Sequence, residues 1–269
     1  MNDSKIDRES QFWDARAAAD AERDPELYRV SADLRYDRSV PWLPQLGFPL
    51  FLECLLDRIG GLDGKRVLDL GTGSGFLASL LAANGAQVDA VDVSEASLAV
   101  ARWRAEISGV ADRIRFHCRP AEALGFEDAC FDAACGVFVL HHLDLSTAAP
   151  ELRRVLRPGG AGAFIETSAR SSVLRIARNL LPGRFGIEKA SSDDEAPLDV
   201  SAAVILKQVF GQSVQMDYPS TVFFRMASYI PPLHHAPAER LLAQLDALLH
   251  RVPALRSQSY HCVVSFRRD

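Results

Sequence analysis

Lys65-Arg-Val-Leu-Asp-Leu-Gly-Thr-Gly-Ser-Gly75 is the stretch that decides the fold, because a short apolar run leads directly into a turn rich in glycine. The run Val67-Leu-Asp-Leu70 has the apolar character of a parallel strand that is covered on both faces. The glycines of the turn allow positive φ and let main-chain N–H groups approach a ligand closely. We therefore expect a strand at 65–70, a ligand-binding turn, and a helix from Phe76 to Ala83.

Two acidic residues end the first two predicted strands. Asp69 lies beside the turn, where its carboxylate can accept from an ammonium group or from backbone donors. Ala86-Gln-Val-Asp-Ala-Val-Asp92 predicts a second strand, and its last carboxylate can bind both hydroxyls of a ribose. A dinucleotide site would have a small residue where this chain has Phe76, which disfavours a nicotinamide oxidoreductase, the less favoured alternative. The pattern indicates a nucleoside cofactor that carries positive charge.

Asp69 followed by G-x-G-x-G resembles motif I of the class I S-adenosylmethionine (SAM) dependent methyltransferases. Further motifs follow in that family's order: Phe131 to His142 resembles the fourth strand and its loop, and Leu156 to Gly160 resembles the turn before strand five. The likeness is close from Leu62 to Thr167. It implies an α/β, Rossmann-like, mostly parallel sheet of seven strands in the order 3-2-1-4-5-7-6, with helices on both faces. It also implies in-line displacement at the sulfonium methyl of SAM.

The resemblance implies contacts to the cofactor residue by residue. Asp92 matches the ribose-binding acid, Val93 the residue under the adenine, and Ala121-Glu122 the pair that meets the adenine ring and its amino group. Arg35 and Tyr36 are candidates for reaching the amino-acid end of SAM. The expected cofactor-binding residues are Asp69, Gly71, Thr72, Gly73, Gly75, Asp92, Val93, Ala121, Glu122, Gly136, Arg35 and Tyr36.

His141 and His142 follow the predicted fourth strand and are the candidate catalytic residues. An oxygen nucleophile has to lose a proton, and an imidazole titrates near neutral pH. The alternative is that these histidines only pack or hydrogen-bond within the loop. A second pair, His234-His235, could share a metal with the first, but adjacent histidines do not project to one point. No metal is therefore expected.

The acceptor is narrowed by charge and by missing motifs. A net charge of -5 gives no electrostatic footprint for nucleic acid or anionic lipid. The loop at Cys135 to Phe138 lacks the Asn/Asp-Pro-Pro-aromatic motif of the resembling nucleic-acid enzymes, and Glu166 has no obvious partner for gripping a guanidinium. We expect a small, partly apolar acceptor, with O-methylation favoured and C- or N-methylation open. The alternative is the same fold used for another reaction or for binding.

The length of 269 residues, 48% of them hydrophobic, favours one α/β domain with extra segments. We expect residues 1–60 to form a helical extension or lid, and residues 61–269 to form the SAM-binding domain with cap insertions at 168–196 and 220–237. The extension holds five aromatic residues that could close over the site or merely pack onto the sheet: Phe12, Trp13, Tyr28, Tyr36 and Trp42.

The remaining elements follow from hydrophobic periodicity and capping signals. Helices are expected at 8–21, from Asp24-Pro25, at 48–59, 94–108 with Ser94 as its cap, 149–156, 168–181, 197–210 and 238–251. Strands are expected at 113–118, 131–137, 161–167, 214–218 and 259–267, the last two forming an antiparallel hairpin. The alternation around the core implies parallel strands with right-handed crossovers.

The five cysteines are odd in number and lie mostly in apolar contexts, which predicts reduced core residues in a cytosolic protein. No stretch is long and apolar enough to span a membrane, and Met1 to Ser10 lacks the layout of a signal peptide. We expect a cytoplasmic monomer or homodimer whose partner is a small molecule, without nucleic acid or membrane.

Overall fold

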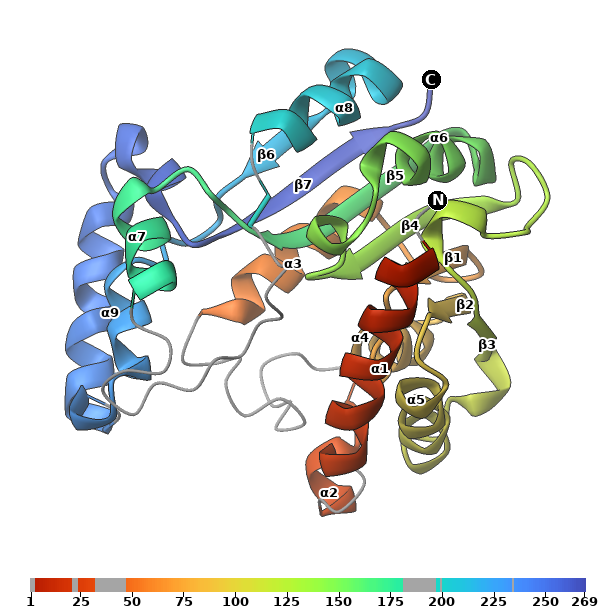
Figure 1. Cartoon of the computed structure of the whole chain (residues 1–269), viewed down its shortest axis with the longest axis horizontal. Coiled ribbons are helices and arrows are strands. Elements are labelled where there is room, and N and C mark those ends of the chain that lie inside the picture. The colour runs from red at the N-terminus through yellow and green to blue at the C-terminus, as the bar shows by residue number, and fades with distance from the viewer. Residues whose placement is uncertain (1–2, 21–23, 32–46, 181–196, 199, 234) are drawn as a thin grey trace.

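The computed structural model describes residues 3–20, 24–31, 47–180, 197–198, 200–233 and 235–269. Within these residues a sheet of seven strands, in the order β3-β2-β1-β4-β5-β7-β6, forms the centre of the molecule (Figure 1). The strands are β1 (Arg66–Leu70), β2 (Gln87–Asp92), β3 (Ile114–Cys118), β4 (Phe131–Val137), β5 (Leu156–Thr167), β6 (Gln215–Asp217) and β7 (His261–Arg267). β7 pairs antiparallel with β5 and β6, and the other pairs are parallel. The predicted order and hairpin are confirmed.

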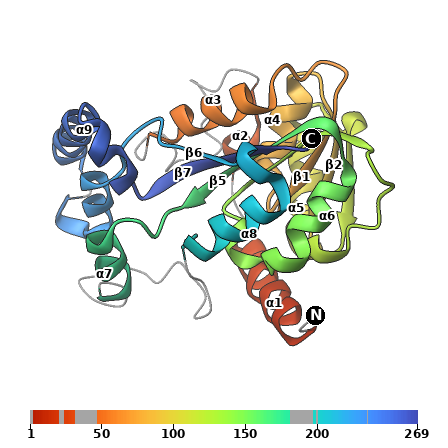
Figure 2. The same cartoon turned by 90° about the horizontal axis from the view of Figure 1, so that it is seen from above.

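Helices cover both faces of the sheet because each carries one apolar face that has to be buried. The side chains of α3 (Phe48–Ile59), α4 (Phe76–Ala83) and α5 (Glu95–Ile107) bury apolar surface on one face. Those of α6 (Leu145–Val155) and α8 (Val200–Phe210) do so on the other. Figure 2 shows α3 and α4 on one side of the strands and α6 and α8 on the opposite side.

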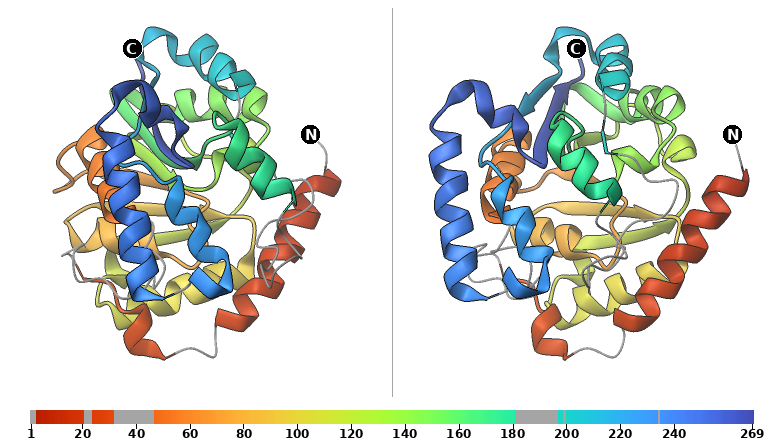
Figure 3. Two further views of the ribbon diagram at one scale, coloured as in Figure 1. Left: turned by 90° about the vertical axis from the view of Figure 1, so that its left-hand side faces the viewer. Right: turned by 60° about the vertical axis from the view of Figure 1, so that its left-hand side comes forward.

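The remaining helices stand around the sheet. α7 (Ser172–Leu180) and α9 (Ala236–His250) lie together at one end, and α1 (Asp3–Asp20) lies to one side of them (Figure 1, and the left view of Figure 3). The short helices are α2 (Pro25–Tyr28), η2 (Ala111–Arg113), η3 (Ala121–Ala123), η4 (Leu140–His142), η5 (Gly211–Ser213), η6 (Phe224–Tyr229), η7 (Pro231–Leu233) and η8 (Pro253–Gln258). The predicted residues Arg35, Tyr36 and Trp42 and the segment 181–196 lie outside the described residues.

Two predicted boundaries are wrong for local reasons. α6 begins at Leu145 and not at 149, because Asp144 caps it: its carboxylate accepts from the N–H of Ser146 at 3.1 Å. Pro150 consequently lies inside the helix. β5 begins at Leu156, so the expected turn at 156–160 is already part of the strand. The predicted cap of α5 is confirmed, since the Ser94 hydroxyl accepts from the N–H of Ser97 at 2.9 Å.

The cysteines are all free thiols, and three of them, Cys130, Cys135 and Cys262, are buried as expected. Cys54 is half-buried, and Cys118 is exposed, which contradicts a core position for that residue. None of the helices in the described part of the chain has the length and apolar character needed to cross a membrane.

Candidate functional site

Those predicted site residues that the structure describes gather where the parallel strands end. β1 pairs with β2 on one side and with β4 on the other, so the strand order reverses at β1. In open α/β sheets ligands bind outside the carboxyl ends of the strands at such a switch point. The residues described below follow β1, β2, β4 and β5 at this edge.

The glycine turn after β1 combines close packing with an open position. A Cβ at Gly71 would lie 2.4 Å from Cγ2 of Val139, and one at Gly75 would lie 2.6 Å from Cβ of Ala101. Gly73 also has positive φ, but no described heavy atom lies within 4 Å of its Cβ position. The outer two glycines let the turn fit against the loop after β4 and against α5. The middle one leaves room for a ligand to approach the backbone.

Asp69 is buried at the end of β1 with one oxygen unpartnered. Its Oδ2 accepts from the Thr72 hydroxyl at 2.6 Å, whereas Oδ1 accepts no hydrogen bond from the described residues. Burial raises the pKa of Asp69 to about 7; the Thr72 hydroxyl lowers it, the nearby charge of Asp92 raises it, and the Ala78 amide lowers it least. A buried carboxylate oxygen without a donor fits a ligand that brings an N–H group or positive charge.

Asp92 ends β2 and is held by backbone donors. Its Oδ2 accepts from the N–H of Gly73 at 2.8 Å and its Oδ1 from the N–H of Ser94 at 2.9 Å. Burial raises the pKa of this carboxyl, and these backbone hydrogen bonds oppose the rise. The neighbouring carbonyl of Val93 accepts from the Ser10 hydroxyl of α1 at 3.1 Å. The carboxylate is thus fixed in orientation, while each oxygen keeps a lone pair for a hydroxyl donor.

The remaining expected cofactor residues have local structural partners. Ala121 is buried in η3, and the half-buried Glu122 accepts from the N–H of Asp144 at 3.1 Å. Gly136 in β4 is required by packing, because a Cβ there would lie 2.5 Å from the carbonyl oxygen of Leu70. These contacts account for the positions of Glu122 and Gly136, and their role in cofactor binding stays a prediction.

Glu166 and His141 form a buried pair at the ends of β5 and η4. Oε2 of Glu166 lies 2.6 Å from Nδ1 of His141, and the two side chains are 0% and 1% exposed. Oε1 of Glu166 accepts from the N–H groups of Val139 and Leu140 at 2.9 and 2.7 Å. These partners are an imidazole and two backbone groups; a second carboxylate for gripping a guanidinium, which the sequence does not indicate, is not among them. The partners of Glu166 lie in the segment after β4, about 25 residues earlier in the chain. No local sequence signal indicates them.

His142 contacts the N-terminal helix. Its Nδ1 lies 3.3 Å from Oε1 of Glu9, and its ring meets that of Trp13 edge to face with centroids 5.9 Å apart. Trp13 also donates its indole N–H to Glu9 at 3.2 Å. These contacts of α1 were missed by sequence reasoning, apart from the suggestion that Trp13 could close over the site. In the second histidine pair, His235 caps α9 by accepting from the N–H of Ala238, and His234 lies outside the described residues.

A Rossmann-like sheet in the order 3-2-1-4-5-7-6, with a glycine turn between two buried acids, defines a class of enzyme. Residues 68–164 match the family described as "Methyltransferase domain". A ubiquinone biosynthesis O-methyltransferase from Acinetobacter baumannii is 32% identical over 174 residues, which cover 61% of this chain and 73% of that protein. The chain belongs to the class I SAM-dependent methyltransferases, and SAM is its methyl donor.

Further relatives agree at the level of sequence and of fold. A ubiquinone biosynthesis O-methyltransferase from Aromatoleum aromaticum is 39% identical over 118 residues, covering 43% of this chain and 49% of that protein. The structure of geranyl diphosphate C-methyltransferase from Streptomyces coelicolor superposes with a TM-score of 0.59 at 15% identity, covering 86% and 83% of the two chains. The [4+2]-cyclase SpnF superposes with a TM-score of 0.56 at 22% identity, covering 82% and 81%. The structural likenesses establish the fold alone.

The raised pKa of Asp69 predicts a stability change with pH. A carboxyl whose folded pKa is above its unfolded value binds more protons in the folded state, so stability falls as pH rises from about 4 to about 7. Asp69→Asn removes this titration, and we expect it to raise the free energy of unfolding at pH 8, relative to wild type, by at most about 4 kcal/mol. Urea unfolding without SAM at pH 4 and pH 8 measures the difference. The exposed control Asp112→Asn should show no such dependence; an equal effect of Asp69→Asn at both pH values would contradict the assignment.

Proposed function

We propose that the enzyme methylates a hydroxyl oxygen of a small, partly apolar acceptor. The observation that carries this proposal is the buried pair of Glu166 and His141 at the edge where the parallel strands end. An oxygen nucleophile loses its proton during methyl transfer, and a carboxylate-oriented imidazole is suited to receive it. An amine or a stabilised carbanion would need no base of this kind. The relatives from ubiquinone biosynthesis are named as O-methyltransferases, which supports the same choice.

We also propose roles for the residues around the cofactor. The turn from Gly71 to Gly75, which includes Thr72, would bind the cofactor with its backbone, Asp92 would accept from the ribose hydroxyls, and Asp69 would face the ammonium group. The expected adenine contacts are Val93, Ala121 and Glu122, and Gly136 is a further expected cofactor residue. The donor set fits SAM because the unpartnered Oδ1 of Asp69 calls for a cationic or N–H ligand. Bound SAM supplies a methyl carbon made electrophilic by the sulfonium.

Asp92→Ala tests the ribose role. The variant removes a charged acceptor from two hydroxyls, and we expect SAM to bind at least about tenfold more weakly, since hydrogen bonds to charged groups contribute about 1.5–3 kcal/mol. Calorimetric titration of SAM into the folded variant gives the affinity, and Asp112→Ala serves as an exposed control. Undiminished affinity would remove the ribose assignment. Binding of NAD in place of SAM would point to the oxidoreductase alternative.

The proposed base is Nε2 of His141. The carboxylate of Glu166 accepts from Nδ1–H, so in the proposed mechanism Nε2 is the ring nitrogen that receives the proton. The same carboxylate binds the N–H groups of Val139 and Leu140 and so fixes the loop that carries the ring. Glu166 is in this view a positioning residue. The ring of His142 lies tilted beside that of His141, with centroids 4.2 Å apart, and contacts α1.

His141→Gln and Glu166→Gln separate the base from its orienting group. We expect His141→Gln to lower kcat by about 10²–10⁴-fold and to flatten the acidic limb of the pH profile, with the affinity for SAM unchanged. Glu166→Gln should lower kcat less and move that limb to lower pH, because the imidazolium loses the stabilising carboxylate. His142→Gln is the matched control for the pH profile: it should keep the acidic limb, even where the lost contact with α1 changes kcat. A wild-type kcat of His141→Gln at every pH, with SAM saturating, would eliminate the base and favour a carbon or nitrogen nucleophile.

We propose that residues 1–60 act as a lid on the domain 61–269, whose cap insertions at 168–196 and 220–237 bound the acceptor. α1 contacts both sides of the switch point. On the β2 side Ser10 donates to the Val93 carbonyl, and the Asp14 carboxylate accepts from the N–H of Ala96 at 3.3 Å. On the β4 side Glu9 and Trp13 contact His142. A helix held at both places would exclude water from the edge between them.

Trp13→Ala tests the lid. Loss of the ring should raise the KM for the acceptor or lower kcat, because closure over the site becomes less favourable, while the fold is kept. The matched control is Gln11→Ala, a change on the exposed side of the same helix. Steady-state kinetics with an acceptor found by methyl transfer to a metabolite library and mass shift give both constants. Wild-type kinetics of the Trp13 variant would reduce the extension to a packing element.

The alternative is that the fold serves another reaction, since fold does not determine chemistry. SpnF, whose structure has a similar fold, is named as a cyclase. The metabolite library distinguishes the two: a product heavier by one methylene supports methyl transfer. Conversion of a compound without consumption of SAM would support the alternative.

A further inference from the structure

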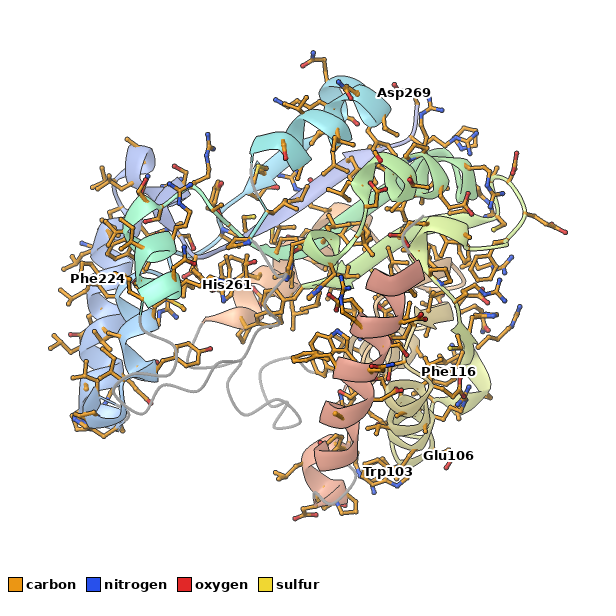
Figure 4. All side chains as sticks on the ribbon, viewed as in Figure 1. Trp103, Glu106, Phe116, Phe224, His261 and Asp269 are labelled. Carbon is orange, nitrogen blue, oxygen red and sulfur yellow. The ribbon has the colours of Figure 1, made fainter. Side chains whose placement is uncertain are left out.

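His261 begins β7 and stands opposite Thr167, the last residue of β5. Because β7 runs antiparallel to β5, its first residue lies at the same edge as the carboxyl ends of the parallel strands. Figure 4 shows His261 in the interior, between the sheet and the end of the molecule formed by α7 and α9. Residues directly opposite in an antiparallel pair point to the same face of the sheet. Ile165 and Val263, two residues further along each strand, belong to the apolar core under α3, so this face is the α3 face.

Three polar atoms of this cross-strand pair have no partner. Among the described residues neither Nδ1 nor Nε2 of His261 makes a hydrogen bond, and neither does Oγ1 of Thr167. The exposed fractions of the two residues are only 3% and 7%. A buried polar group without a partner costs about 1–3 kcal/mol, and such groups are rare in native proteins. Three unpartnered atoms at one place, on the edge that binds ligands, indicate a ligand that satisfies them.

The surroundings of His261 are aromatic. Its ring centroid lies 5.9 Å from that of Phe51 in α3, 5.1 Å from that of Phe138 and 5.1 Å from that of Tyr260. Phe138 follows β4 with φ of 55°, a strained value for this residue, and is held there by donating its N–H to the carbonyl of Ile165 at 2.8 Å. Aromatic residues of α3, of the loop after β4 and of the segment that leads into β7 therefore meet at the imidazole of His261.

The imidazole is neutral in this environment. Burial, helped by the charge of Arg225, lowers the pKa of His261 to about 3. Arg225 is itself committed to the buried carboxylate of Asp246, with Nε 3.0 Å from Oδ2. A neutral imidazole offers one N–H donor and one acceptor nitrogen, and the Thr167 hydroxyl offers both functions as well. The matching ligand group donates and accepts a hydrogen bond without bringing a charge.

We infer that His261 and Thr167 bind a neutral hydroxyl group of an aromatic acceptor, remote from the oxygen that receives the methyl group. The aromatic side chains around His261 would pack against the ring of that acceptor. A carboxylate is disfavoured, because it would be buried without a cation of its own. This inference rests on the proposed function only in taking the edge beside β4 and β5 as the acceptor site. It adds the chemical class that the acceptor presents there.

The test compares phenol with toluene, which differ only by a hydroxyl in place of a methyl group. Each compound is titrated into the full chain labelled with ¹⁵N-histidine, and the imidazole resonances are followed; His261→Phe assigns the His261 signals. We expect phenol to move the His261 nitrogen resonances and to bind about five- to tenfold more tightly than toluene, the effect of one net hydrogen bond. His261→Phe and Thr167→Val should reduce that ratio toward one.

A matched control is His250→Phe, the same change at a histidine whose Nδ1 lies 3.1 Å from the Thr221 hydroxyl. This variant should keep the preference for phenol and lower the Tm. His261→Phe should leave the Tm unchanged or raise it, because it removes unpartnered polar atoms. Thr167→Val, which keeps the imidazole, provides the measurement if His261→Phe does not fold. Phenol that leaves the His261 resonances unmoved, or an unchanged ratio in Thr167→Val, would overturn the inference.

Calorimetry with S-adenosylhomocysteine on the same samples measures whether each variant still binds the cofactor. The phenol response and the activity of His141→Gln together separate this inference from the proposed function. If His261 responds to phenol while His141→Gln retains full activity on the identified acceptor, the binding site stands and the base does not. A lowered Tm of folded His261→Phe, without loss of the phenol preference, would assign the histidine a structural role and overturn the inference.

Discussion

The buried carboxylate of Glu166 is the interaction on which the reactive side of this site depends. It accepts from two successive backbone N–H groups and from the imidazole of His141. A carboxylate that loses its water needs such donors, because an unpaired buried charge is costly. All three donors belong to the loop after β4. The need of the Glu166 carboxylate on β5 for hydrogen bonds therefore fixes the path of the loop that follows the neighbouring strand, β4. That loop in turn places Val139 against Gly71, where no Cβ would fit.

The carboxylates at this edge differ in how completely the protein satisfies them. Asp92 and Glu166 have donors on both oxygens, whereas Asp69 has a donor on only one. The difference appears in the pKa of Asp69, which burial raises to about 7. The backbone donors fix the orientation of Asp92 and leave lone pairs for neutral hydroxyl donors. Asp69, with one oxygen unpartnered among the described residues, keeps an electrostatic demand that a cationic ligand can meet.

The sequence was sufficient to predict the fold and the position of those site residues that are close together in the chain. The glycine turn, Asp69 and Asp92 are close together in the chain, and β-strand ends bring them to one place, so spacing alone predicts their neighbourhood. The partners of Glu166, the contacts of Glu9 with His142, and the pairing of Thr167 with His261 join residues 25 or more positions apart. No local pattern encodes such pairs, so the sequence alone does not predict them. The start of α6 differs from the predicted residue 149 because the side chain of Asp144 caps the helix and lets it begin at Leu145.

The same division explains why likeness to known proteins identifies the donor and not the acceptor. The family match ends at residue 164, just before Glu166 and Thr167, and it leaves out α1, α3 and β7. The proposed SAM contacts Asp69 and Asp92 lie inside the match, and SAM is the part of the reaction that members share. We propose that elements from both ends of the chain bound the acceptor, and such loops and insertions on a rigid sheet commonly differ between proteins. Its chemistry therefore has to be inferred from unsatisfied atoms such as those of His261, because native folds leave few buried polar groups unpaired and each one needs an explanation.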